Sequence, residues 1–284
     1  MHILVTGAQG MLGRDLVPYL ESRGHRVTGI DMEVDITDPS AIAHAVRAHA
    51  PDAVINGAAY TNVDAAEEDE ATATRVNGDG AGNVAAACAA LGIPMVQVST
   101  DYVFDGTAGR DYAEDDPVAP MGAYGRSKLA GERAAVAAHP GGVRIARTAW
   151  LYGAHGRNFI DTMRGLGCER DEVTVVADQV GCPTWTRDLA PALEALISAP
   201  PGVYHTAGGG STSWAGLARE VFRAAGIDCA VRDITTAELG RPAPRPARSV
   251  MAVTKPGAPA LRDWRVALGD YLRDNPMDEG ERTP

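Results

Sequence analysis

Short apolar runs alternate with longer amphipathic stretches along the first half of the chain. The apolar runs are bounded by Gly, Pro, Asn, Asp or Ser, and they predict five strands at residues 2–7, 26–31, 52–56, 94–100 and 142–150. Between them, helices are predicted at residues 11–24, at 39–50, at about 63–91 and around Tyr124 and Lys128. Strands separated by helices form right-handed βαβ units, so the pattern predicts a parallel sheet.

The chain after about Leu151 is less regular and carries a Pro/Arg-rich stretch at residues 240–249. We therefore expect an α/β fold in two parts. Residues 1–150 form a doubly wound parallel sheet, and residues 151–274 form a smaller, partly helical lobe that is partly interleaved with it. The charged, Pro-ended tail at residues 275–284 is predicted to be disordered.

Composition and charge narrow the class of protein. The net charge of −11 argues against a nucleic-acid-binding surface. The four cysteines form no C-x-x-C pair, and the acidic run at residues 67–70 reads as a solvated helical face, so no metal site is expected. The N-terminus lacks a signal-peptide pattern, and no apolar run reaches the roughly 18 residues of a membrane span. These features predict a cytoplasmic protein without a nucleic-acid or membrane partner.

A glycine turn follows the first strand directly. The segment "TGAQGMLG" places Gly7, Gly10 and Gly13 in a G-x-x-G-x-x-G pattern that leads into a helix. Glycine permits a tight turn, and the helix N-terminus then offers free N–H groups to a pyrophosphate. The position of this turn predicts that residues 1–150 bind a dinucleotide.

The second strand ends at Asp31, where a carboxylate can accept hydrogen bonds from the hydroxyls of an adenosine ribose. No arginine follows immediately to hold a 2′-phosphate, so Asp31 favours NADH over NADPH. Asp35 and Ile36 are expected to flank the adenine by analogy only.

A tyrosine and a lysine stand four residues apart in "AYGRSKLAGE", and on a helix Tyr124 and Lys128 share a face. The lysine charge is expected to lower the tyrosine pKa, so that the phenol can exchange a proton near neutral pH. This pair is typical of hydride transfer between a nicotinamide and a ketone or alcohol.

The fourth strand ends in two hydroxyl side chains, Ser99 and Thr100, at the edge of a parallel sheet where ligands bind. Successive strand residues face opposite sides, so only one of the two hydroxyls can face the substrate.

Together these residues resemble the extended short-chain dehydrogenase/reductase family over residues 3 to about 272. Within it, the segments "NGAAYTNVDAAE", "STDYVFDG", "YGRSKLAGE", "RTAWLYG" and "VADQVGCPT" are most similar to dTDP-4-dehydrorhamnose reductases. The resemblance implies a Rossmann-type sheet, NADPH or NADH as cofactor, and a dTDP-sugar substrate whose C4 ketone is reduced.

The resemblance also assigns roles to residues. It implies that Thr100 polarises the carbonyl, that Tyr124 donates the proton, and that Lys128 binds the nicotinamide ribose. The expected cofactor-binding residues are Gly7, Gly10, Met11, Leu12, Gly13, Asp31, Asp35, Ile36, Ala58, Ala59, Tyr60 and Lys128. The sugar nucleotide is expected to border Asn62, Val63, Asp101, Tyr102 and Trp150, and Asp178 and Gln179 lie in a matching segment of the smaller lobe.

Departures from the family pattern leave alternatives open. Relatives carry other residues where this chain has Gly57, Gly122, Arg248 and Met251. Asp101 is followed by Tyr102 rather than the Glu of related dehydratases, so elimination of water is not expected. A sugar-nucleotide epimerase, or a non-catalytic regulatory subunit resembling that of methionine adenosyltransferase, remains an alternative function. The oligomeric state is a separate question, with a homodimer as one alternative.

Weaker signals concern one histidine and three arginines. His205 is expected to be a hydrogen-bonded structural residue rather than a catalytic one. Arg241, Arg245 and Arg248 either bind the diphosphate of the substrate or belong to an exposed loop.

Overall fold

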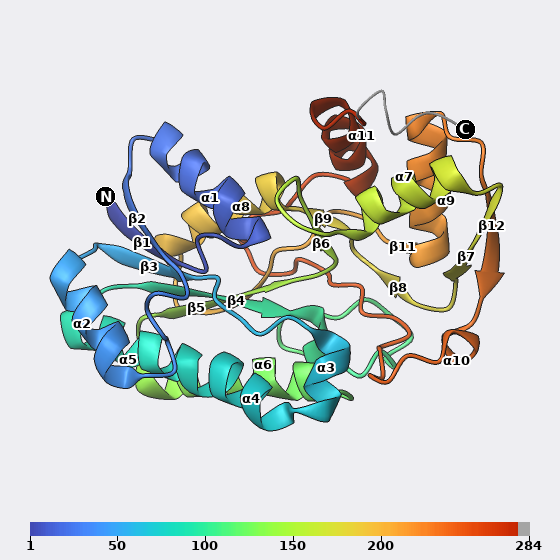
Figure 1. The fold of residues 1–284 in the computed structure, drawn as a ribbon. Coiled ribbons are helices and arrows are strands. Elements are labelled where there is room, and N and C mark those ends of the chain that lie inside the picture. The colour runs from blue at the N-terminus through green and yellow to red at the C-terminus, as the bar shows by residue number, and fades with distance from the viewer. Residues whose placement is uncertain (278–284) are drawn as a thin grey trace.

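A six-stranded sheet forms the centre of the computed structural model, which describes residues 1–277, and all its neighbouring strands are parallel (Figure 1). The strand order is β10, β5, β4, β3, β1, β2. The strands are β1 (His2–Thr6), β2 (Arg26–Ile30), β3 (Ala53–Asn56), β4 (Met95–Thr100), β5 (Val143–Thr148) and β10 (Gly202–His205). The predicted parallel sheet is confirmed, and β10 adds a sixth strand to the five expected.

Helices cover both faces of this sheet, which is why its central strands read as nearly continuous apolar runs. On one face α1 packs beside α8, and Leu16 and Leu20 of α1 join Leu189 and Leu193 of α8 in one core (Figure 1). The other face is covered by α2, α5 and α6 (Figure 1). The bounds are Met11–Ser22 (α1), Thr186–Ile197 (α8), Pro39–His49 (α2), Gly80–Leu91 (α5) and Ala123–Ala138 (α6).

The helical stretch expected over about residues 63–91 is confirmed, with one interruption. Asp69 leaves helical geometry, with φ −139° and ψ 69°, and its side chain caps the next segment by accepting from the Thr72 N–H at 2.9 Å. The stretch is therefore α3 (Val63–Glu68), α4 (Glu70–Thr74), a π-helical turn η1 (Arg75–Asp79) and α5. A short 3₁₀ turn, η2 (Asp101–Val103), follows β4 directly.

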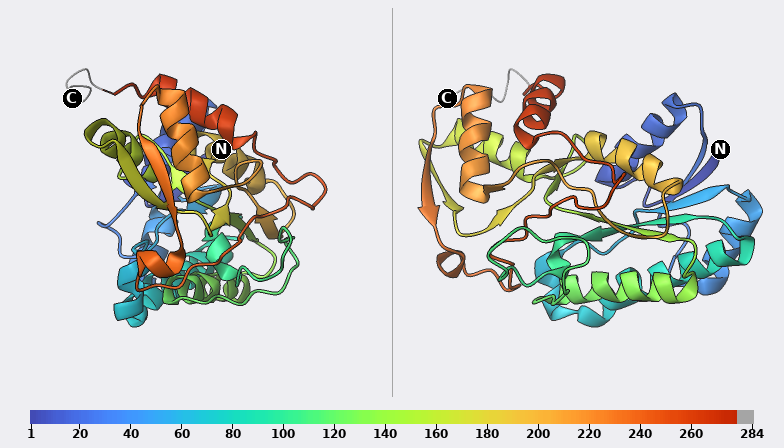
Figure 2. Two further views of the ribbon diagram at one scale, coloured as in Figure 1. Left: turned by 90° about the vertical axis from the view of Figure 1, so that its right-hand side faces the viewer. Right: turned by 180° about the vertical axis from the view of Figure 1, so that it is seen from behind.

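A second group of elements lies beside the carboxyl edge of the sheet, as the two views of Figure 2 show. Its own core packs apolar faces of α7, α9 and α11 around the large side chains Tyr152, Trp264 and Tyr271. The helices are α7 (Phe159–Glu169), α9 (Trp214–Ala225), α10 (Thr236–Leu239) and α11 (Trp264–Asp274). The strands pair as β7 (Glu172–Val176) with β12 (Ala230–Ile234), β6 (Leu151–Tyr152) with β9 (Thr184–Trp185), and β8 (Val180–Gly181) with β11 (Thr212–Ser213).

The chain crosses between the two groups more than once. After β9 it returns to the large sheet for α8 and β10, and it then leaves again for β11 and α9. Within residues 1–277, no helix has both the length and the apolar character needed to cross a membrane. Most of the predicted disordered tail, residues 278–284, lies outside the described residues, and Asn275 caps α11.

Candidate active site

The pleat of β4 separates the two hydroxyls that end it. Ser99 is buried on one side, where its Oγ donates to Glu132 Oε1 at 2.6 Å. Thr100 faces the other side, where its Oγ1 accepts from the Tyr102 N–H at 3.2 Å. The Thr100 hydroxyl donates in turn to Asp101 Oδ1 at 3.1 Å. Thr100 is therefore the hydroxyl on the side of Tyr102 and Asp101, and Ser99 is engaged in the core.

Tyr124 begins the first turn of α6 beside this threonine. Its ring meets the edge of the Tyr102 ring, with centroids 5.7 Å apart and planes at 82°. Burial and the Asp101 carboxylate raise the pKa of Tyr124 to about 12, and a hydrogen bond with Thr100 opposes them. The expectation that Lys128 lowers this pKa is wrong, because burial and a neighbouring negative charge outweigh the helical spacing.

Lys128 lies one turn further along α6 and is only 5% exposed. Its Nζ donates to the Val98 carbonyl of β4 at 2.7 Å. Burial lowers the pKa of Lys128 to about 8, against the charge of Glu132, which raises it. The lysine is thus fixed against the sheet edge, where burial disfavours its charged form. An ammonium group has three N–H donors, so the hydrogens not used by Val98 can bond a ligand.

The glycine turn fits a pyrophosphate cradle. Gly7 has φ +68°, and a Cβ there would lie 2.8 Å from the Ala58 nitrogen, while a Cβ at Gly13 would lie 2.4 Å from the Gly7 oxygen. Gly10 caps α1 without a side-chain hydrogen bond, so the N–H groups at Met11 and Leu12 have no capping side chain. Backbone close to the site and an uncapped helix N-terminus are what a dinucleotide phosphate requires.

Acidic side chains follow β2 next to this turn. Asp31 Oδ2 accepts from the Gln9 N–H of the glycine turn at 2.8 Å, and its Oδ1 accepts from the Met32 N–H at 2.9 Å. Asp35 accepts from the Thr37 N–H at 2.8 Å and lies at the surface. Ile36 is buried in the core of the sheet against α5, so its side chain is not open to a ligand.

Asn77 joins the loop after β3 to α6, and sequence reasoning missed it. Its side chain accepts from the Tyr60 N–H at 2.8 Å and donates to the Tyr60 carbonyl at 3.0 Å. It also donates to Ser127 Oγ at 2.9 Å, and Ser127 donates to the Tyr124 carbonyl at 2.8 Å. Ala58, Ala59 and Tyr60 are thereby fixed relative to α6. The available signal was an asparagine inside an alanine-rich helical stretch, where it is a poor helix former.

The residues that were expected to border the substrate lie in different surroundings. Asn62 caps α3 by accepting from the Ala65 N–H at 3.2 Å, and Val63 begins that helix. Trp150 has a φ of +46°, rare for a residue with a side chain, and its ring stacks on Trp214 with centroids 3.6 Å apart. Asp101, by contrast, is 1% exposed, and its second oxygen accepts from Ser249 Oγ at 2.5 Å.

Asp178 and Gln179 support the lobe through its own elements. Asp178 accepts from the backbone and the hydroxyl of Thr236 in α10, at 2.9 and 2.7 Å. Gln179 accepts from the Trp214 indole N–H at 3.2 Å. Gln179 therefore holds Trp214, which lies against Trp150.

The three arginines of the Pro/Arg-rich stretch are engaged in ion pairs. Arg245 and Arg241 reach Asp64 on α3 at 2.9 and 3.4 Å, and Arg248 reaches Asp111 at 2.5 Å. The stretch therefore runs back across the sheet edge and ties α3 to the smaller lobe.

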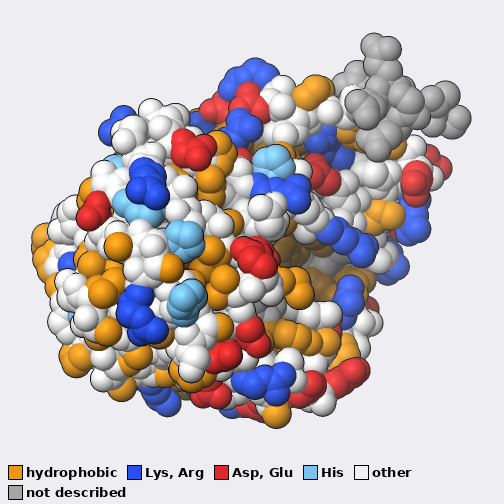
Figure 3. Space-filling model, turned by 60° about the vertical axis from the view of Figure 1, so that its left-hand side comes forward, with side chains coloured by type: hydrophobic (Ala, Val, Ile, Leu, Met, Phe, Trp, Pro, Cys, Tyr) orange, Lys and Arg blue, Asp and Glu red, His pale blue; other side chains and the backbone are white. Residues whose placement is uncertain are grey.

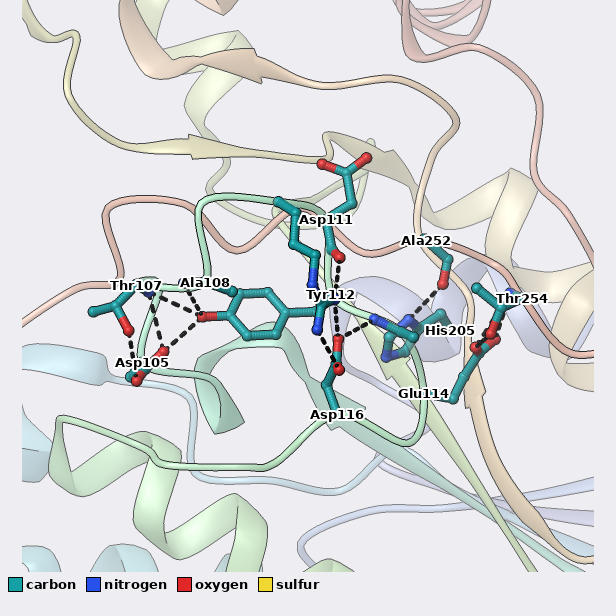
Figure 4. A network of polar contacts seen from close by, with 12 residues as sticks. Asp105, Thr107, Ala108, Asp111, Tyr112, Glu114, Asp116, His205, Ala252 and Thr254 are labelled. Carbon is teal, nitrogen blue, oxygen red and sulfur yellow. Dashed lines mark hydrogen bonds and ion pairs between the residues drawn. The ribbon is translucent and has the colours of Figure 1, made fainter.

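A polar network anchors the segment between η2 and α6 (Figure 4). The Tyr112 hydroxyl donates to Asp105 at 2.6 Å and accepts from the Thr107 and Ala108 N–H groups, and its ring stacks on Phe104. His205 bonds the Ala252 carbonyl through Nδ1 at 2.7 Å, which confirms the predicted structural histidine. The Tyr112 N–H donates to the Val250 carbonyl at 2.8 Å, and Glu114 accepts from the Thr254 N–H at 3.2 Å, so the segment that leads to Tyr124 is fixed to residues 250–254.

Between the sheet and the smaller lobe the molecule is hollowed, and Figure 3 shows hydrophobic side chains on the floor of this hollow. Among residues 1–277 there is no cluster of three or more His, Cys, Asp or Glu side chains placed to hold a metal ion. The side chains gathered at the sheet edge offer the hydroxyl of Thr100, the phenol of Tyr124 and the amine of Lys128.

Comparison with known proteins agrees with this arrangement. A family model described as the RmlD substrate binding domain matches residues 1–276. The chain is 49% identical to a dTDP-4-dehydrorhamnose reductase of Streptomyces griseus, covering 93% of this chain and 91% of that protein. It is 44% identical to a dTDP-4-keto-6-deoxy-D-glucose reductase of Streptomyces niveus, covering 93% of this chain and 94% of that protein.

Solved structures share the fold of this chain over nearly its whole length. A dTDP-4-dehydrorhamnose reductase of Clostridium acetobutylicum superposes with a TM-score of 0.93 at 42% identity, covering 98% of this chain and all of that one. The enzyme of Bacillus anthracis, solved in complex with NADP, has a TM-score of 0.93 at 37% identity, covering 96% of this chain and 99% of that one. The chain therefore belongs to the dTDP-4-dehydrorhamnose reductase family of Rossmann-type reductases.

Proposed function

We propose that the protein reduces the C4 ketone of a nucleotide-linked 6-deoxy-4-ketohexose with NADPH or NADH, converting dTDP-4-dehydro-L-rhamnose into dTDP-L-rhamnose. The observation that carries the proposal is the meeting of Thr100, Tyr124 and Lys128 at the carboxyl end of β4. Two strands away, β1 ends in the glycine turn, so a cofactor on that turn lies along the same sheet edge. The family membership supports the same substrate class.

The residues have distinct tasks in this proposal. When bound, the reduced nicotinamide supplies a hydride to the ketone carbon. Thr100 donates a hydrogen bond to the ketone oxygen, where negative charge develops. The O–H bond of Tyr124 breaks as its proton passes to that oxygen, which leaves an alcohol and a tyrosinate. Lys128 would hold the nicotinamide ribose by donating hydrogen bonds from its Nζ.

The remaining assignments follow from the same division of labour. Residues 1–150 would bind the dinucleotide and residues 151–274 would close over the sugar nucleotide, with Trp150 and Tyr102 beside the sugar. Both NADPH and NADH remain in the proposal, because the carboxylate of Asp31 favours an unphosphorylated ribose while the Bacillus anthracis relative was solved with NADP. We place the enzyme in the cytoplasm, where this cofactor pool is found, and the homodimer stays a prediction.

The test follows the loss of reduced-nicotinamide absorbance. Purified protein is mixed with dTDP-4-dehydro-6-deoxy-D-glucose and a 3,5-epimerase, with NADPH and NADH in parallel. Oxidation that requires the epimerase, and that is lost in Tyr124→Phe, supports the proposal and ranks the cofactors. Cofactor binding without oxidation would contradict it.

A second candidate is direct reduction of dTDP-4-keto-6-deoxy-D-glucose, which the Streptomyces niveus relative favours. Oxidation that proceeds equally well without the epimerase would select this activity. Tightly bound NAD after purification, with turnover that consumes no added cofactor, would instead indicate an epimerase.

A further inference from the structure

A carboxyl group that the proposed chemistry does not use lies directly behind Thr100. Asp101 is 1% exposed, and each of its oxygens has a hydroxyl partner. Oδ1 accepts from Thr100 Oγ1 at 3.1 Å, and Oδ2 accepts from Ser249 Oγ at 2.5 Å. Because the side chain is enclosed, Asp101 acts on the site through Thr100 rather than by touching a sugar. This differs from the expected substrate contact.

Ser249 comes from a distant part of the chain and is itself fixed. It is 1% exposed, and its N–H donates to the Val180 carbonyl at 2.9 Å. Its neighbour Arg248 is held by Asp111. The segment after the Pro/Arg-rich stretch therefore delivers one hydroxyl to Asp101 from a rigid position.

The geometry allows two directions for the bond between Asp101 and Thr100. A hydroxyl has one hydrogen and two lone pairs, and one lone pair of Thr100 already accepts from the Tyr102 N–H. When Asp101 is ionised, the Thr100 hydrogen points at the carboxylate. When Asp101 is neutral, its Oδ1–H can donate to the second lone pair, and the Thr100 hydrogen is free for a substrate oxygen. Ser249 donates to Oδ2 in both cases.

We propose that Asp101 is a positioning residue for the ketone reduction proposed above, that Ser249 holds its carboxyl group, and that the proton of this group sets where Thr100 donates its hydrogen. The neutral form is the more active one in reduction. It frees the Thr100 hydrogen for the ketone oxygen and removes a negative charge from beside the developing alkoxide.

The surroundings of Asp101 place the gain and loss of its proton in a pH range where enzyme activity can be measured. Burial raises the pKa of Asp101 to about 6, while the bonds from Ser249 and Thr100 lower it. Burial also raises the pKa of Tyr124 to about 12 and that of Cys182 to about 11, so both stay neutral when Asp101 titrates. The titratable and charged groups around the site are Tyr102, Asp111, Tyr124, Cys182, Arg245 and Arg248.

The experiment measures kcat of reduction as a function of pH at saturating substrate and cofactor. In the wild type, kcat falls by about tenfold or more as pH rises through about 6. In Asp101→Asn the amide oxygen can accept from Ser249 and the amide nitrogen can donate to Thr100. This variant mimics the neutral acid, so it stays active and loses the inflection. In Ser249→Ala the carboxylate loses a donor, so the inflection moves to higher pH by about one unit.

Ser99→Ala is the matched control, because Ser99 also donates to a buried carboxylate but on the opposite side of β4. It should leave the inflection in place. An unchanged inflection in Asp101→Asn or Ser249→Ala would overturn the proposal. A wild type that oxidises no cofactor would instead contradict the proposed function.

A measurement that needs no enzymatic activity covers the case of a wild type that oxidises no cofactor. In infrared difference spectra, a protonated carboxyl band should appear as pH falls through about 6, before the exposed carboxylates titrate near about 4. This component should be absent in Asp101→Asn and should persist to higher pH in Ser249→Ala. A component near pH 6 that survives in Asp101→Asn would also overturn the proposal.

Discussion

The indole rings of Trp150 and Trp214 lie face to face, with centroids 3.6 Å apart and planes within 5° of parallel. Trp150 holds a backbone conformation with φ +46°, which costs free energy and persists only where neighbouring groups enforce it. Trp214 is the neighbour, and its own N–H is fixed by Gln179. The orientation of Trp150 at the sheet edge is therefore set by a residue that begins α9.

Removing this stack should weaken sugar binding. We expect Trp214→Ala to raise KM for the sugar nucleotide by about three- to tenfold, the range that one aromatic pair provides, because Trp150 can then relax. KM for NADPH should not change, and Trp214→Phe should keep part of the effect. Steady-state kinetics with each substrate varied in turn would check this, and equal effects on both KM values would contradict it.

Lys128 should destabilise the fold that it serves. Its pKa falls from 10.5 to about 8 on burial, so the folded protein holds the charged amine at a penalty. We expect Lys128→Met to raise the free energy of unfolding at pH 7 by about 1–3 kcal/mol while abolishing reduction.

The pH dependence gives the sign of this effect. Below pH 8 the amine is charged in both states and the penalty is fully present. Between about 8 and 10.5 only the unfolded amine stays charged, so the penalty fades and the advantage of Lys128→Met shrinks. Urea unfolding of both proteins at pH 7 and pH 9.5 would measure it. A constant difference would contradict the assignment.

Removing one partner of the buried ion pair between Arg147 and Glu132 should lower stability more than removing both partners. Arg147 contacts Glu132 through two bonds, of 2.9 and 2.7 Å, and both side chains are nearly enclosed. Arg147→Met leaves an unpaired buried carboxylate and should lower stability by about 3–5 kcal/mol. The double variant with Glu132→Leu should recover most of this loss in denaturant unfolding. Additive losses would show that the pair is not the cause.

The glycine turn should tolerate no side chain at Gly13, where a Cβ would lie 2.4 Å from the Gly7 oxygen. Gly13→Ala should weaken NADPH binding by at least about tenfold, because the turn must open to accept the methyl group. Gly165→Ala is the matched control, since a Cβ there meets nothing within 4 Å inside α7. It should raise stability slightly and leave the Kd for NADPH, measured by fluorescence titration, unchanged.

The sequence carried the local part of this site. The glycine spacing, the Tyr124–Lys128 spacing and the strand that ends in Thr100 each lie within a few residues, and the predicted parallel order of the strands brings them to one sheet edge. The choice between Ser99 and Thr100 also follows from the pleat, once the residue opposite is known to be Glu132.

The non-local part could not be predicted in this way. Ser249 reaches Asp101 across 148 residues, and Trp214 reaches Trp150 through packing of separate elements. The predicted direction of the Tyr124 pKa shift was wrong for the same reason. It depends on burial and on Asp101, which helical spacing does not reveal.

The return of the chain to the large sheet has a consequence for synthesis on the ribosome. When the chain has emerged only as far as Thr148, β5 is the last strand of the sheet and its outer edge has no partner. β10, which covers that edge, is made some fifty residues later, after β6 to β9 and α8. We therefore expect nascent chains of intermediate length to expose a pairing edge and to engage chaperones until Gly202–His205 has left the exit tunnel.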